Sequence, residues 1–79
     1  MKSMMRKTIK LATPQDVKEF YFAASELPRN VSAIVSHNEF RVDGKSILGM
    51  FGLNLSEPVT LTITSEENLD KKRIDDLFS

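Results

Sequence analysis

Apolar and polar residues alternate along several parts of the chain, and this alternation predicts half-buried β-strands. The most regular run covers residues 59–64, where three apolar side chains alternate strictly with three threonines. A shorter run over residues 7–12 places Ile9 and Leu11 on one face and polar side chains on the other. Each of these strands can therefore contribute one face to a hydrophobic core.

Residues 31–42 predict a β-hairpin. A two-residue turn at positions 37–38 would pair Val35 with Phe40, and all the apolar side chains of the hairpin would then share one face. These side chains are Val31, Ala33, Val35, Phe40 and Val42. We therefore expect Phe40 in the core, and we expect residues 43–44, Asp-Gly, to form the turn that leaves the sheet.

The segment between the first strand and the hairpin predicts an amphipathic helix. Thr13 can cap its N-terminus, Pro14 suits the first helical position, and Asp16 is favourable near the positive end of the helix dipole. An apolar stripe at helical spacing follows, and Pro28 ends the helix. Phe22 falls on the polar side and is either an edge residue or a contact surface. The stripe consists of Val17, Phe20, Tyr21, Ala24 and Leu27.

A second, shorter helix is predicted from Ser46, its N-cap, to about Leu53. Its apolar residues lie on two sides, and Met50 and Leu53 share one of them. A helix this short cannot bury both sides against a single sheet, so one side should be exposed. We expect that exposed side to consist of Ile47, Leu48 and Phe51.

The C-terminal segment predicts a third helix, capped by Ser65, with Glu66 and Glu67 in its first turn. Its expected core positions are Leu69, Ile74, Leu77 and Phe78. The order β-α-β-β-α-β-α over residues 1–79 indicates a single domain of the two-layer α+β class, with one antiparallel sheet backed by helices. The side chains that we expect to be mostly buried are Ile9, Leu11, Phe20, Val31, Val35, Phe40, Leu61, Ile63 and Leu77.

Composition narrows the function classes. Eleven basic residues balance eleven acidic residues, so no overall charge favours a nucleic acid or an anionic membrane. The chain has no cysteine and no apolar run of signal-peptide or membrane-spanning length. We therefore expect a cytoplasmic protein with no membrane insertion. We also find no metal-ligand cluster, cofactor motif or nucleophile-base pair, and we expect neither a metal nor a cofactor.

The run over residues 44–53, Gly-Lys-Ser-Ile-Leu-Gly-Met-Phe-Gly-Leu, resembles the second-helix motif of the HPr family, the phosphocarriers of the bacterial phosphotransferase system. The typical run in that family is Lys-Ser-Ile-Met-Gly, followed by two apolar residues, a small residue and leucine. The predicted order of elements also matches this family over nearly the whole chain. The resemblance implies an open-faced sandwich with strand order 1-4-2-3 and all helices on one face of the sheet.

The chain departs from the HPr family in the loop before the first helix. In that family the loop carries the phosphorylated histidine, in a Gly-(Leu/Ile)-His-x-Arg-Pro pattern. The corresponding residues here contain neither histidine nor arginine, and they include Thr13, Pro14, Gln15 and Asp16. Threonine and glutamine cannot form a comparable phosphoramidate, and Asp16 would repel an incoming phosphoryl group. The only histidine, His37, falls in the predicted hairpin, so we expect no catalytic residue.

The second-helix motif implies a different kind of site. In many Gram-positive HPr proteins the serine that matches Ser46 is phosphorylated by a regulatory kinase, and the product binds a transcriptional regulator. The matching helix face is the family's docking patch for partner proteins. The resemblance therefore gives Ser46 as the candidate phosphorylation site, and it gives Lys45, Ile47, Leu48 and Phe51 as candidate partner-binding residues. Ser46 also has a purely structural role as a helix cap.

Three functions remain open from the sequence. The first is a non-enzymatic, HPr-like regulatory or adaptor protein that acts through the Ser46 helix face. Its partners would be phosphotransferase-system components, a serine kinase or a transcriptional regulator. The second is an atypical phosphocarrier that uses an unusual residue. The third is an interaction module in which neither the serine nor the histidine has a role. An acid-labile phosphoprotein, formed with phosphoenolpyruvate and enzyme I, would distinguish the second from the others.

Overall fold

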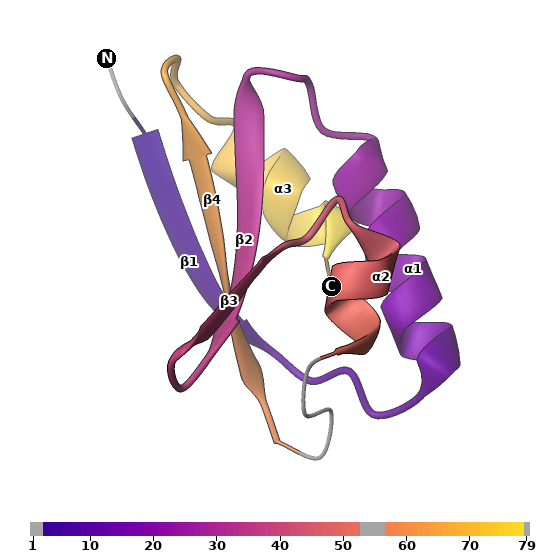
Figure 1. Cartoon of the computed structure of the whole chain (residues 1–79). Coiled ribbons are helices and arrows are strands. Elements are labelled where there is room, and N and C mark those ends of the chain that lie inside the picture. The colour runs from indigo at the N-terminus through magenta and orange to yellow at the C-terminus, as the bar shows by residue number, and fades with distance from the viewer. Residues whose placement is uncertain (1–2, 53–56, 79) are drawn as a thin grey trace.

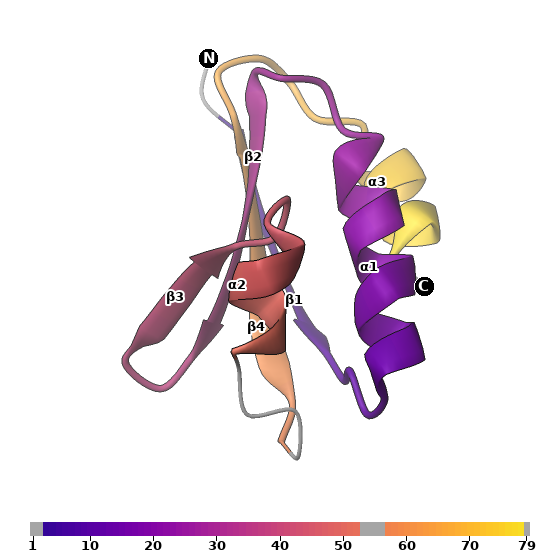
Figure 2. The same ribbon diagram turned by 45° about the vertical axis from the view of Figure 1, so that its right-hand side comes forward.

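The computed structural model describes residues 3–52 and 57–78, which form one antiparallel sheet and three helices (Figure 1). In chain order, the elements are β1 (Ser3–Ile9), α1 (Pro14–Ser25), β2 (Val31–His37), β3 (Phe40–Asp43), α2 (Ile47–Phe51), β4 (Val59–Ser65) and α3 (Lys71–Leu77). The strand order is β1-β4-β2-β3. The helices cover one face of the sheet, as Figure 2 shows. The predicted α+β class, element order and strand order 1-4-2-3 are confirmed.

β4 lies between β1 and β2 and pairs with both along its length. Its apolar residues Val59, Leu61 and Ile63 are at most 2% exposed, whereas the threonines between them are half-buried. This is the burial expected of a central strand with helices over one face only. The strict alternation in the sequence therefore predicted both the strand and its buried side.

The core lies between the helix-covered face of the sheet and the inner sides of the three helices. α1 contributes Val17, Phe20 and Ala24, α2 contributes Met50, and α3 contributes Ile74. The remaining buried apolar residues come from the strands and the loop after β1: Leu11, Val31, Ala33, Val35, Val59, Leu61 and Ile63. Burial of each large aliphatic side chain stabilises the fold by about 1.5–3 kcal/mol.

Three of the nine side chains expected to be mostly buried are less buried than predicted, and the expected helix-core positions Leu69 and Phe78 are also only half-buried. Ile9 and Leu77 are half-buried, and Phe40 is 71% exposed. The hairpin loop consists of Asn38 and Glu39 rather than residues 37–38, with Asn38 in the left-handed conformation at φ 55°. Phe40 therefore pairs with His37 at the hairpin end instead of with Val35. A shift by two positions keeps Phe40 on the predicted face but moves it beyond the cover of the helices.

The prediction that Ser65 caps the last helix was wrong. Ser65 is the final residue of β4, where it pairs with Ser3 and Val31, and it is only 3% exposed. The cap is Asp70, whose Oδ1 accepts a hydrogen bond from the Arg73 backbone amide at 3.1 Å. A carboxylate suits this position as well as a hydroxyl does, so capping preference alone does not favour Asp70 over Ser65.

The other predicted boundaries differ by a few residues. β1 begins and ends earlier than the predicted 7–12, because it follows β4 along its whole length to Ser3. α1 ends at Ser25, and the half-buried Leu27 lies just beyond its C-cap. The predicted end of the second helix, Leu53, lies outside the described residues.

Candidate functional site

The N-terminus of α1 carries Thr13, Pro14, Gln15 and Asp16, which the sequence resemblance matched to the HPr active-site loop, and Thr13 and Asp16 form a complete capping box. The Thr13 hydroxyl accepts from the Asp16 backbone amide at 3.1 Å. In return, one Asp16 carboxylate oxygen accepts from the backbone amides of Ala12 at 2.9 Å and Thr13 at 3.2 Å. Pro14 occupies the first turn and has no N–H to donate.

This capping leaves little room for a phosphoryl group. The amides of Ala12, Thr13 and Asp16 already have acceptors, and that of Val17 donates to the Thr13 carbonyl at 3.2 Å. An anion would also have to approach the Asp16 carboxylate, which places negative charge in the first turn of the helix. The Gln15 side chain reaches Glu19 at 3.5 Å and adds no positive charge. The amides at the N-terminus of α1 thus bind the Asp16 carboxylate and the Thr13 hydroxyl instead of a phosphate.

Removal of the Thr13 hydroxyl should destabilise the fold. We expect Thr13→Ala to lower the free energy of unfolding by about 0.5–2 kcal/mol, because the Asp16 amide loses its acceptor. Gln15→Ala, one helical position from the box, is the matched control and should stay within about 0.5 kcal/mol of the unmodified chain. Urea denaturation followed by circular dichroism measures both. Equal costs for the two variants would contradict the role of the capping box.

The second candidate site begins in the tight turn between β3 and α2. The Asp43 carboxylate accepts from the Lys45 amide at 2.8 Å, and the Asp43 carbonyl accepts from the Ser46 amide at 2.9 Å. Ser46 then caps α2, with its exposed hydroxyl 3.4 Å from the Gly49 amide. The predicted cap is confirmed. The hydroxyl is therefore both accessible and next to the start of the helix.

Lys45 does not extend toward Ser46. Its half-buried side chain donates from Nζ to the carbonyl oxygens of Pro28 at 3.1 Å and Val31 at 2.7 Å. The ammonium therefore holds the loop between α1 and β2. The Lys45 ammonium is therefore not directed at Ser46, because two backbone carbonyls already bind it.

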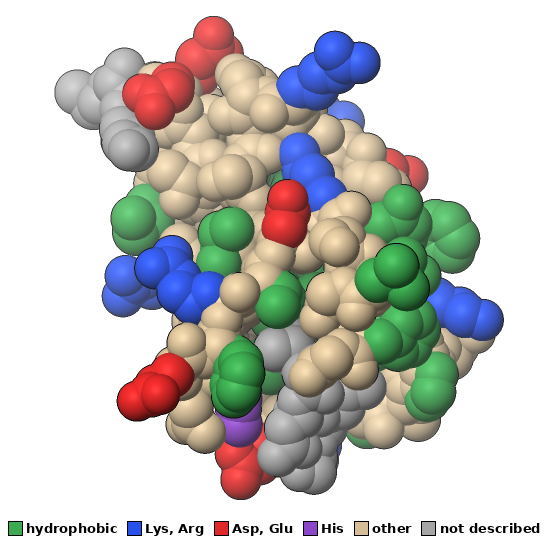
Figure 3. All heavy atoms as spheres, in the orientation of Figure 1, with side chains coloured by type: hydrophobic (Ala, Val, Ile, Leu, Met, Phe, Trp, Pro, Cys, Tyr) green, Lys and Arg blue, Asp and Glu red, His purple; other side chains and the backbone are tan. Residues whose placement is uncertain are grey.

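The face of α2 that we call the α2 patch consists of Ile47, Leu48 and Phe51. Leu48 is 83% exposed, Phe51 is 42% exposed, and Ile47 is half-buried. Met50, on the core-facing side of the helix, is fully buried. The spacings of three and four residues make the members of the patch neighbours on the helix surface. Figure 3 shows hydrophobic side chains gathered over the α1 and α2 region of the molecule.

One contact could not be read from the sequence, whereas one exposed aromatic residue had a signal there. The His37 imidazole, whose side chain is only 11% exposed, lies with Nε2 2.6 Å from a carboxylate oxygen of Glu57. The two residues are 20 positions apart, so no local motif predicts the contact. Phe22, the apolar residue on the polar side of α1, is 65% exposed and near Tyr21. Its exposure had a signal in the sequence, namely its place outside the apolar stripe.

Neither metal ligands nor membrane helices are found in the described part of the chain. Within residues 3–52 and 57–78, no three side chains of histidine, cysteine, aspartate or glutamate are grouped so that they could hold a metal ion. No helix there is both long and apolar enough to cross a bilayer.

Comparison with known proteins gives a result at the level of structure only. No protein-family model matches the sequence, and no curated protein is similar enough to be counted as a relative. Among solved structures, HPr-C-His from Thermoanaerobacter tengcongensis superposes with a TM-score of 0.65 at 20% identity, over 94% of this chain and 85% of that one. The phosphocarrier protein HPr from Bacillus anthracis str. Ames gives 0.63 at 20% identity, over 95% and 93%. The chain has an HPr-like fold.

The HPr-like fold accounts for the strand order that the resemblance implied. It also means that both candidate sites belong to elements that HPr structures share, the first helix and the second helix. At 20% identity the similarity establishes the arrangement of the backbone. The chemistry of each site therefore rests on the side chains described above.

Proposed function

We propose that this chain is an HPr-like regulatory or adaptor protein, related to the phosphotransferase system, that binds another protein through the α2 patch. The observation that supports this most directly is the two-sided character of α2. Met50 is fully buried, while Leu48 and Phe51 expose large apolar surfaces beside an accessible Ser46 hydroxyl. Exposed apolar side chains that lie together favour a protein-protein contact. In this proposal the protein has no catalytic residue and acts in the cytoplasm.

Phosphorylation of Ser46 would control the contact through charge. A phosphoserine carries about −1.5 to −2 charges at neutral pH. At Ser46 this charge would lie at the border of the α2 patch, and Lys45 could not neutralise it while its ammonium binds the carbonyls of Pro28 and Val31. The modification would therefore change which partner binds. Candidate partners are phosphotransferase-system components, a serine kinase and a transcriptional regulator.

The capped N-terminus of α1 supports this proposal over an atypical phosphocarrier. A carrier needs a nucleophile beside amides that can hold the transferred phosphate. The amides of Ala12, Thr13 and Asp16 are instead bound within the capping box.

The test uses purified HPr serine kinase and the regulator that binds serine-phosphorylated HPr. Kinase and ATP should phosphorylate Ser46, and Ser46→Ala should remain unmodified. Ser46→Asp should alter regulator binding but shift the free energy of unfolding by less than about 1 kcal/mol, since the site is exposed. Phe51→Ala should weaken binding by about 1–2 kcal/mol whatever the state of Ser46.

Phe40→Ala is the matched control, because Phe40 is 71% exposed but lies at the β2–β3 hairpin. Isothermal titration calorimetry measures all variants. Equal binding by Phe51→Ala and Phe40→Ala would remove the α2 patch from the interface. If the kinase does not phosphorylate Ser46 but the chain still binds the regulator, the chain is an interaction module that is not controlled at Ser46.

A further inference from the structure

β1 forms an open edge of the sheet. Its seven residues pair with β4, and β4 is its only neighbour among the described strands. In an antiparallel pair, every second residue of an edge strand turns its N–H and C=O away from the partner. These groups form a template on which another extended chain can add a strand.

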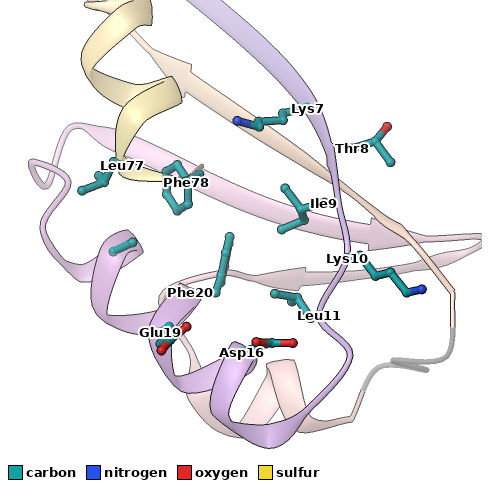
Figure 4. Close-up of a pocket in the computed structure, with 11 residues that line it drawn as sticks. Lys7, Thr8, Ile9, Lys10, Leu11, Asp16, Glu19, Phe20, Leu77 and Phe78 are labelled. Carbon is teal, nitrogen blue, oxygen red and sulfur yellow. The ribbon is translucent and has the colours of Figure 1, made fainter.

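A groove of about 360 Å³ runs beside this edge (Figure 4). Residues 7–11 line it without interruption, so both the backbone and the inward side chains of this segment border the groove. Figure 4 shows Ile9 and Leu11 directed toward Phe20 of α1, whereas Thr8 and Lys10 point the other way. Phe78, whose ring centroid is 5.2 Å from that of Phe20, borders the groove from the α3 side. The helix side of the edge is therefore an apolar recess.

The two sides of the edge differ in charge. Residues 1–15 include four basic residues and no acidic one, and the exposed Arg6 and Lys10 lie on the side away from the helices. Lys7, on the groove side, is bound by Asp75 with Nζ 2.6 Å from a carboxylate oxygen. Asp16 and Glu19 add negative charge to the groove rim. An incoming chain would thus meet an apolar, acid-rimmed recess on one side and the exposed positive charges of Arg6 and Lys10 on the other.

We propose that the β1 edge binds an extended acidic segment of another protein, in which apolar residues alternate with aspartate or glutamate. The backbone of that segment would continue the sheet beyond β1. Its apolar side chains would enter the groove near Ile9 and Phe20, and its carboxylates would lie beside Arg6 and Lys10. A second copy of this chain fits less well, because an antiparallel β1–β1 pair centred on Arg6 would place this charge opposite the same charge of the copy. The surface is separate from the α2 patch.

The test titrates the full chain, labelled with ¹⁵N, with a blocked seven-residue peptide of alternating valine and glutamate, matched to the length of β1. Chemical-shift changes should centre on residues 3–11, and alternate β1 amides should gain protection from hydrogen exchange. Arg6→Glu combined with Lys10→Glu should weaken binding about tenfold. Arg41→Glu is the matched control, since Arg41 is exposed on the same sheet face but on the opposite edge strand, and it should leave binding within about twofold.

Two further peptides separate strand addition from general electrostatic attraction. One carries N-methyl groups on alternate amides, and the other carries them on the intervening amides. Only methylation of the amides that face β1 should abolish binding, because only those N–H groups donate hydrogen bonds to the β1 edge. The proposal is overturned if an alternating valine-lysine peptide binds as tightly, if both methylated peptides bind alike, or if neither charged peptide binds. Shift changes centred on β3 or α2 would overturn it as well.

Discussion

Replacement of Met50 by alanine should lower the free energy of unfolding by about 2–5 kcal/mol. The Met50 side chain is fully buried and joins the core from α2. A helix of five residues has no stability of its own in water, so this anchor holds the helix on the sheet. The truncation would remove apolar contacts and leave a cavity between α2 and the sheet.

Leu48→Ala is the matched control for this prediction. Leu48 is on the same helix, is 83% exposed, and should change the free energy of unfolding by less than about 0.5 kcal/mol. Urea denaturation monitored by circular dichroism compares the two variants directly. Similar losses for Met50→Ala and Leu48→Ala would mean that α2 is not anchored through Met50. The exposure of the α2 patch would then need another explanation.

Phosphoenolpyruvate and enzyme I should leave this chain without acid-labile phosphate. The reason is the side-chain chemistry at the end of α1, where Thr13 and Asp16 cap one another and no imidazole is present. The HPr protein of Bacillus anthracis is the positive control in the same reaction. Intact-mass spectrometry and acid treatment measure the phosphate.

The outcome of this reaction separates the open functional alternatives. Stoichiometric labelling of any residue between Ala12 and Asp16 would contradict the role given to the capping box and favour an atypical phosphocarrier. Labelling of His37 would also favour an atypical phosphocarrier. We do not expect it, because the His37 side chain is mostly buried and its Nε2 lies 2.6 Å from a Glu57 carboxylate oxygen.

The local sequence determined the elements whose signals lie within a few residues. The alternation over residues 59–64 predicted β4 and its buried face, and Thr13 was predicted as the cap of α1. Ser46 was predicted as the cap of α2, and the apolar pattern of this short helix predicted that one side would be exposed. These signals are readable because side-chain period and cap chemistry depend on near neighbours along the chain.

The tertiary structure decided what depends on residues far apart in the sequence. The loop at Asn38 and Glu39 set the hairpin register, and the reach of the helices over the sheet then left Phe40 exposed. Ser65 pairs with two strands and belongs to β4, and the last helix begins at Lys71 with Asp70 as its cap. Local capping preference alone does not distinguish these two positions. The Lys45 ammonium binds the carbonyls of Pro28 and Val31, which lie 17 and 14 positions earlier. Such contacts form only when the whole sheet and its helices are in place, so local sequence patterns do not predict them.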